Sequence, residues 1–139
     1  MGLVHATIKL TNSADLVRYE DERISESQIR SITATMLVDS GAYMLTINET
    51  TKMQLGLKTK YTQTAALADG SVIELDIVGP IEVQFENRRT ACEAMVLSGE
   101  TEMLLGAIPM EAMDVLIHPR ENKLIVNPLH PNMAQLSLR

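Results

Sequence analysis

The feature that most restricts the fold of this chain is a series of short runs in which apolar and polar residues alternate. Alternation with a period of two is typical of strands that bury one face. The runs recur about every ten residues, a spacing that indicates a sandwich or a barrel. We expect strands at residues 4–10, 32–38, 43–47, 62–67, 72–78, 81–85, 90–97, 103–105, 115–117 and 123–126. The sequence therefore predicts an all-β fold.

Two short segments carry the signals of helices. Asn48 is suited to cap a helix over 49–55, and Gly56 stands where a helix usually ends. Pro109 suits the first turn of a second helix that runs to about Asp114. We therefore expect one or two short helices beside the strands.

Two other segments are expected to lack regular structure. Residues 11–30 are polar and rich in charge, which predicts a solvated connection between strands that is long for a compact domain. Gly79-Pro80 is expected to break the chain between two strands. With 139 residues of one composition, the chain (1–139) is expected to be a single domain with one core.

The composition argues against several classes of partner. Lys and Arg total 12 and Asp and Glu total 18, so the net charge is −6. Nucleic acid is not expected as the main partner, because phosphate neutralisation needs a basic face and base stacking needs aromatic side chains, which make up only 3%. No apolar run is long enough to span a bilayer, and the first ten residues lack a signal-peptide pattern. We expect no membrane association and a cytoplasmic location.

Cysteine and histidine offer little chemistry in this sequence. Cys92 is the only cysteine, which excludes an intrachain disulfide, and its strand pattern favours a buried small side chain over a nucleophile. His5, His118 and His130 lack the spacing of a metal site. We expect neither a metal nor another cofactor.

An acidic residue at the end of an apolar run is the most informative local feature. The segment LVDSGA places Asp39 directly after a strand, where a carboxylate is costly to bury unless it is hydrogen-bonded or paired. Ser40 can donate a hydroxyl hydrogen bond, and Gly41 permits a tight turn whose N–H can reach the carboxylate. From these residues alone, the segment is either a surface turn or a site that uses the carboxylate.

The same segment resembles the active-site sequence of retroviral-type (retropepsin-like) aspartic proteases, in which two apolar residues precede Asp, then Thr or Ser, Gly and Ala. Ser40 stands where Thr is commoner, and it keeps the hydroxyl. Further features follow in the family's order: a helix after 46–48, a hairpin turn at 68–71, and an apolar-apolar-Gly motif at 104–106 before a helix. The resemblance covers about residues 33–127 and is closest to bacterial and cellular members.

The resemblance implies a closed, β-barrel-like acid protease fold that hydrolyses peptide bonds with a water held between two carboxylates. One carboxylate acts as base, and the other, protonated, polarises the scissile carbonyl. Only Asp39 is followed by Ser or Thr and Gly, so one chain supplies half a site. A two-fold homodimer would bring Asp39 against its symmetry mate. The resemblance then implies that the Ser40 hydroxyl forms a hydrogen bond to the same loop of the partner chain. It also implies that Gly41 allows the backbone to approach closely at this site.

The resemblance also assigns substrate contacts. It places Ala42 beside the catalytic loop, and Ala68, Asp69 and Gly70 at the tip of a flap that closes over a peptide. The alternative for the tip is a plain hairpin turn, since both residues of Asp-Gly can adopt a positive φ. Gly106 is expected to permit tight packing below the catalytic loop rather than to act in catalysis.

The expected function is that of a homodimeric aspartic endopeptidase acting on a peptide or protein substrate. Because a fold does not determine a function, a catalytically silent peptide-binding or dimerisation module on the same fold is the alternative. An unrelated all-β binding protein is a third possibility. The sequence does not distinguish the first two, since both would be dimers.

Overall fold

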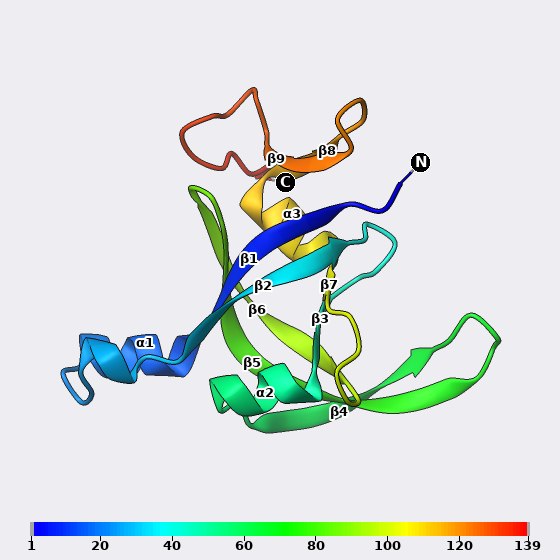
Figure 1. Cartoon of the computed structure of the whole chain (residues 1–139). Helices are drawn as coiled ribbons and strands as arrows, with labels where there is room; N and C mark the ends of the chain where they lie inside the picture. Colours follow the sequence, from blue (N-terminus) through cyan, green and yellow to red (C-terminus); the bar gives the residue numbers. More distant parts are fainter. Residues whose placement is uncertain (1, 139) are drawn as a thin grey trace.

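The computed structural model describes residues 2–138 and contains nine strands and three α-helices (Figure 1). One sheet holds β1 (His5–Asn12), β2 (Ser31–Val38), β3 (Leu45–Asn48), β4 (Thr59–Ala66), β5 (Val72–Phe85), β6 (Arg88–Leu97) and β7 (Leu104–Leu105). A separate antiparallel pair holds β8 (Val115–His118) and β9 (Lys123–Val126). The helices are α1 (Ser13–Glu20), the 3₁₀-helix η1 (Glu26–Gln28), α2 (Glu49–Leu55) and α3 (Ala107–Met113).

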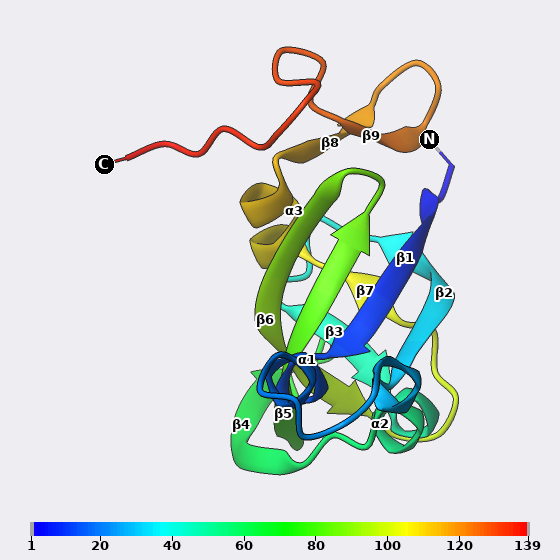
Figure 2. The same ribbon diagram turned by 90° about the vertical axis from the view of Figure 1, so that its left-hand side faces the viewer.

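The main sheet closes on itself. Its strand order is β1-β2-β7-β3-β6-β5-β4, and β1 also pairs with β5, so that a ring forms and β4 extends from β5 (Figure 2). The second pairing runs from Lys9 opposite Gln84 to Asn12 opposite Ile81. Closure leaves few strand edges exposed to unwanted pairing. The predicted all-β, ring-like fold is confirmed, with three short α-helices instead of one or two.

The core lies inside the ring. Alternate side chains of β1, those of Ala6, Ile8 and Leu10, are buried, while the side chains between them are exposed, as a period of two requires. Buried positions of the other strands join them in a single apolar core, which includes Met36, Leu45, Ile47, Val78, Ile81, Val83, Ala94, Val96 and Leu105. Among residues 2–138, no helix is long and apolar enough to cross a membrane.

Helix α2 forms as its sequence predicts. The side chain of Asn48 accepts a hydrogen bond from the Thr51 N–H at 2.8 Å, and Gly56 ends the helix in the left-handed conformation with φ 62°. These two contacts satisfy donors and acceptors that a helix leaves unpaired at its ends.

The β4–β5 hairpin is also confirmed, with a different turn from the one expected. The Leu67 N–H donates to the Ser71 carbonyl at 2.8 Å, which leaves a three-residue loop. Within that loop only Gly70 has a positive φ, 87°, so Asp69 does not adopt the expected positive φ. A turn followed by one left-handed residue is the usual form of a three-residue hairpin loop.

The expected connection over residues 11–30 is largely exposed, as predicted, but the prediction that it lacks regular structure is wrong. The chain continues β1 to Asn12 and then forms α1 and η1. The Asn12 side chain caps α1 by accepting from the Asp15 N–H at 3.1 Å, and it also donates to the Leu55 carbonyl at 2.8 Å. Because Asn12 is buried and satisfied by two other elements, the segment is part of the folded unit.

The expected break at Gly79-Pro80 is wrong as well. Strand β5 runs through it, and the register with β6 shifts between Val78 and Ile81. The irregularity bends the long strand, so that its first half pairs with β4 and its second half with β1. Gly79 has φ 132°, and a Cβ there would lie 3.2 Å from the Glu93 Cα, so a larger residue would be strained at the bend.

Candidate active site

Strand β2 delivers Asp39 into a tight loop at the end of the ring. β2 runs parallel to β7, with Val38 opposite Leu105, and the Asp39 N–H continues this pairing by donating to the Leu105 carbonyl at 3.0 Å. The loop then closes when the Ala42 N–H donates to the Asp39 carbonyl at 3.1 Å. The backbone around the carboxylate is therefore held by both its neighbours in the sheet and its own turn.

The Asp39 carboxylate has one oxygen engaged. Its Oδ1 accepts a hydrogen bond from the Gly41 N–H at 2.9 Å, and among residues 2–138 this is the carboxylate's only hydrogen bond. The Asp39 residue is half-buried, while Ser40 and Gly41 are exposed. A carboxylate oriented by one backbone donor and open on its other side can bind a water molecule or a second carboxylic acid.

Gly106 supports this loop from below. The Ala107 N–H donates to the Ala42 carbonyl at 2.8 Å, and the Ile108 N–H donates to the Tyr43 carbonyl at 3.0 Å. A Cβ at Gly106 would lie 2.9 Å from the Ala42 oxygen and closer still to the Met44 oxygen. The tight packing expected at this glycine is present, and it places the start of α3 directly against the loop.

Two hollows with largely apolar linings flank the loop. Ser40 lines one of them together with Met110, Glu111 and Ile117. Asp39 and Ser40 line the other together with residues of the N-terminal segment and the end of β2, which are Gly2, Leu3, Val4, Leu37 and Val38. Apolar hollows next to a positioned polar group are typical of ligand sites.

The hairpin tip lies away from the loop. Ala68, Asp69 and Gly70 are exposed, and no hydrogen bond among residues 2–138 joins them to Asp39 or Ala42. Asp69 Oδ1 accepts from the Ser71 hydroxyl at 2.6 Å and from its N–H at 2.9 Å, and the hydroxyl bond is the main cause that lowers the pKa of Asp69. The tip and the loop after β2 both project from the right-hand side of the molecule in Figure 1.

The cysteine and histidines form no chemical site. Burial, together with the nearby Glu93 carboxylate, raises the pKa of Cys92 to about 11, so its thiol stays protonated and is a poor nucleophile. Among residues 2–138, no group of three or more His, Cys, Asp or Glu side chains could hold a metal ion.

A family model described as gag-polyprotein putative aspartyl protease matches residues 25–111. The chain belongs to this family. The matched range contains the Asp39 loop, α2, the β4–β5 hairpin and Gly106. The comparison with curated proteins found no match.

Sequence reasoning missed a charged cluster around Asp15. The Asp15 carboxylate is 3% exposed and accepts from Arg30 through Nε at 2.9 Å, Nη2 at 3.0 Å and the backbone N–H at 3.0 Å. Arg18 Nη1 donates to the same carboxylate at 2.8 Å. The hydrogen bonds from Arg30 are the main cause that lowers the pKa of Asp15 to about 2. An N-capping Asn12 three residues before Asp15 was the local signal for a helix here.

Replacing Asp15 with Asn is expected to destabilise the fold by about 1–3 kcal/mol, because hydrogen bonds to a charged group are lost. The effect stays within this range because Arg18 and Arg30 are half-exposed, so that water screens their charges. The pKa of Asp15 is lowered from 3.8 to about 2 on folding, so its contribution is complete above about pH 4 and is lost as the pH falls toward 2. Urea unfolding of both proteins from pH 6 to pH 2 checks this, with exposed Asp21→Asn as the matched control. A stability difference that did not shrink in acid would contradict it.

Proposed function

We propose that residues 1–139 act as one domain of a homodimeric aspartic endopeptidase, in which the Asp39 carboxylates of two chains activate a water for peptide hydrolysis. The observation that carries the proposal is the single half-buried Asp39 carboxylate, held on one oxygen by the Gly41 N–H. Membership of the aspartyl protease family supports the reaction class. Because one chain offers one such carboxylate, a second chain has to supply the other.

The proposed reaction needs the two carboxylates to share one proton. Two like charges at hydrogen-bonding distance cannot both ionise easily, so the pair holds one proton. The ionised Asp39 takes a proton from the water, whose oxygen attacks the scissile carbonyl carbon. The protonated Asp39 gives its proton to the carbonyl oxygen. The C–N bond of this tetrahedral intermediate then breaks as the nitrogen takes the proton that the first Asp39 received from the water. The second Asp39 takes a proton from one hydroxyl of the intermediate, so that an amine and a carboxylic acid leave and the pair again holds one proton.

Each predicted site residue has a role in this proposal. The exposed Ser40 hydroxyl would donate to the partner's loop. Gly41, whose N–H orients the carboxylate, would allow the close backbone approach. Ala42 and the hairpin tip at Ala68, Asp69 and Gly70 would contact the main chain of an extended peptide. The hollows beside the loop would accept apolar side chains of the substrate.

Exposed apolar side chains near the chain ends support a dimer. Leu3, Leu136 and Leu138 are 73%, 61% and 99% exposed. Such side chains are costly to leave in water, and a second copy of the chain would cover them. Leu3 also lines the hollow beside Asp39, so an interface there would adjoin the catalytic loops.

Mixing wild-type chains with Asp39→Asn chains tests the shared site. If dimers exchange freely and need two Asp39 carboxylates, an equal amount of the variant lowers the cleavage rate to about half, and a larger excess lowers it further. The same excess of a heat-denatured variant should have no effect. A rate unchanged by folded Asp39→Asn chains, after exchange is verified by recovery of untagged wild-type chains with an affinity-tagged variant, would show that one chain is sufficient.

A further inference from the structure

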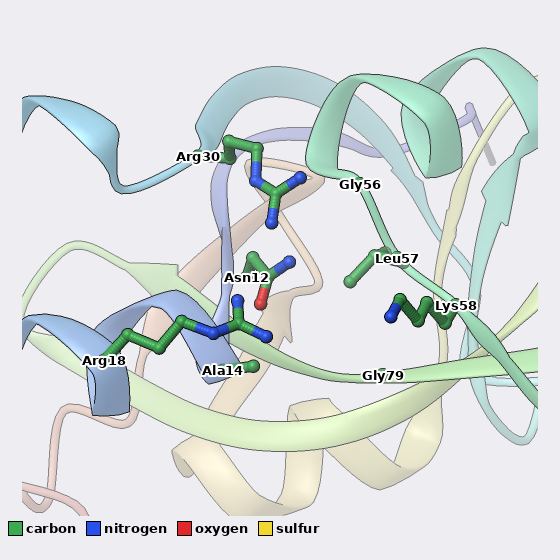
Figure 3. Close-up of a pocket in the computed structure, with 8 residues that line it drawn as sticks. All are labelled: Asn12, Ala14, Arg18, Arg30, Gly56, Leu57, Lys58 and Gly79. Carbon is green, nitrogen blue, oxygen red and sulfur yellow. The ribbon is translucent and has the colours of Figure 1, made fainter. Parts of the chain in front are cut away.

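A second pocket lies at the opposite end of β2 from Asp39 and is rich in positive charge (Figure 3). This basic pocket encloses about 320 Å³ and is lined by Asn12, Ala14, Arg18, Arg30, Gly56, Leu57, Lys58 and Gly79. The lining comes from α1, from the residue before β2, from the end of α2 and from the bend in β5. Since β2 has eight residues, about 26 Å separate this pocket from the catalytic loop.

The charges of the basic pocket are unbalanced. Arg18, Arg30 and Lys58 bring three positive charges, and no acidic residue lines the pocket. Asp15, buried behind the arginines, compensates one of them. Among residues 2–138, Lys58 takes part in no ion pair. The pocket therefore carries an excess of two positive charges on a chain whose net charge is −6.

The Arg30 guanidinium is held in place before any ligand arrives. Asp15 binds Arg30 through both Nε and Nη2, which fixes the plane of the guanidinium. Gly56 lies against the other side of that group, and a Cβ there would collide with Arg30 Nη1. Because the Arg30 side chain is already ordered, ligand binding would cost less of its conformational entropy.

Several donors remain available in the pocket. Arg30 Nη1, Arg18 Nη2 and Lys58 Nζ make no hydrogen bond among residues 2–138. Figure 3 shows these groups around the space beside Asn12. The side chain of Asn12 accepts from the Asp15 N–H and donates one N–H to the Leu55 carbonyl, which leaves it one N–H donor, while the other three vacant donors belong to cations. Such a set matches an acceptor with several oxygens and more than one negative charge.

We propose that the basic pocket binds a phosphate group, either as free phosphate or on a small phosphate monoester. A phosphate dianion would neutralise the excess of two charges and accept from both guanidinium groups and the amine. The volume lies at the lower end of the range for small-molecule sites, which suits a compact ligand. The ligand would join α1, the start of β2 and the end of α2, and would thus stabilise the fold independently of catalysis.

Titration calorimetry and thermal unfolding with inorganic phosphate test this proposal, with chloride at matched ionic strength as the blank. Phosphate should bind the wild-type chain and raise its Tm. Lys58→Gln and Arg18→Gln should each weaken binding by about tenfold or more, since each removes a charged donor. Arg120→Gln, which removes a charge in the turn between β8 and β9, is the matched control and should leave the affinity unchanged. Asp39→Asn should also bind normally, which separates this site from the proposed catalysis.

A second titration with a small sugar phosphate distinguishes the two forms of the ligand. Tighter binding of the ester would identify a monoester site, and equal binding would identify a site for phosphate itself. The proposal is overturned if neither compound binds above the chloride blank. It is equally overturned if Lys58→Gln and Arg18→Gln bind as tightly as Arg120→Gln, because the phosphate would then lie elsewhere.

Discussion

Asp39→Asn is expected to reduce peptide cleavage by about 10³-fold or more while leaving the fold intact. Asn keeps the shape of the side chain and an oxygen that can accept from the Gly41 N–H, so the loop keeps its 2.9 Å hydrogen bond. It cannot take a proton from water. In a dimer both halves of the pair change together, so neither the base nor the acid remains.

The measurement is cleavage of a broad peptide library by the purified protein from about pH 3 to 7. The wild-type rate should follow a bell-shaped profile, because one carboxylate has to be ionised and the other protonated. Asp21→Asn makes the same chemical change at an exposed aspartate after α1 and should keep the full rate.

Other outcomes would have distinct meanings. Glu111 lines a hollow together with Ser40, so an equal loss of rate in Glu111→Gln would place the second carboxylate in the same chain and contradict the dimeric site. If the wild-type protein cleaves no peptide across this pH range, the chain is not an endopeptidase. Peptide binding without cleavage would then favour the silent binding module.

Capping and turn residues predicted those elements whose deciding hydrogen-bond partners lie close to one another in the sequence. The Asn48 cap and Gly56 define both ends of α2, and the Asp69-Gly70 turn joins β4 to β5. In each case the deciding hydrogen bonds span only a few residues. The Asp39 loop belongs to this group, since its carboxylate bond to Gly41 spans two positions.

Long-range contacts explain what the sequence did not show. Helix α1 is stabilised by Arg30, which lies 15 residues from Asp15 in the chain, and by Asn12, which donates to Leu55. Without knowledge of these contacts, the sequence of residues 11–30 indicates only a polar, charged segment. Strand β5 likewise continues through Gly79-Pro80 because β6 pairs on both sides of the bend. Composition and periodicity do not report pairing partners, so these elements required the structure.

The same distinction applies to the proposed half-site. The motif points to the carboxylate, but the loop is supported by residues more than sixty positions later. The Ala107 N–H donates to the Ala42 carbonyl, and Gly106 leaves room for that close approach. A family pattern can place a glycine there. Only the geometry shows that the glycine is needed for space and not for an unusual φ, since its φ is −90°.

Gly106→Ala is therefore expected to destabilise the fold by about 3 kcal/mol or more and to abolish cleavage. The new Cβ would meet the carbonyl oxygens of Ala42 and Met44, which are backbone atoms and cannot rotate away. Relief requires β7 and α3 to move from the loop, which breaks the hydrogen bonds from Ala107 and Ile108. Urea unfolding and the peptide cleavage rate measure the two effects.

Gly99→Ala provides the matched control, because it distinguishes the steric effect of a new Cβ from the strain of a left-handed backbone. Gly99 has φ 67° and no atom within 4 Å of a new Cβ, so Ala there costs about 1 kcal/mol of left-handed strain and should leave cleavage unchanged. At Gly106 the backbone suits any residue and only the space is missing. Equal destabilisation by the two substitutions, with cleavage retained in both, would show that the loop adjusts to a Cβ and that Gly106 does not hold Asp39 in position.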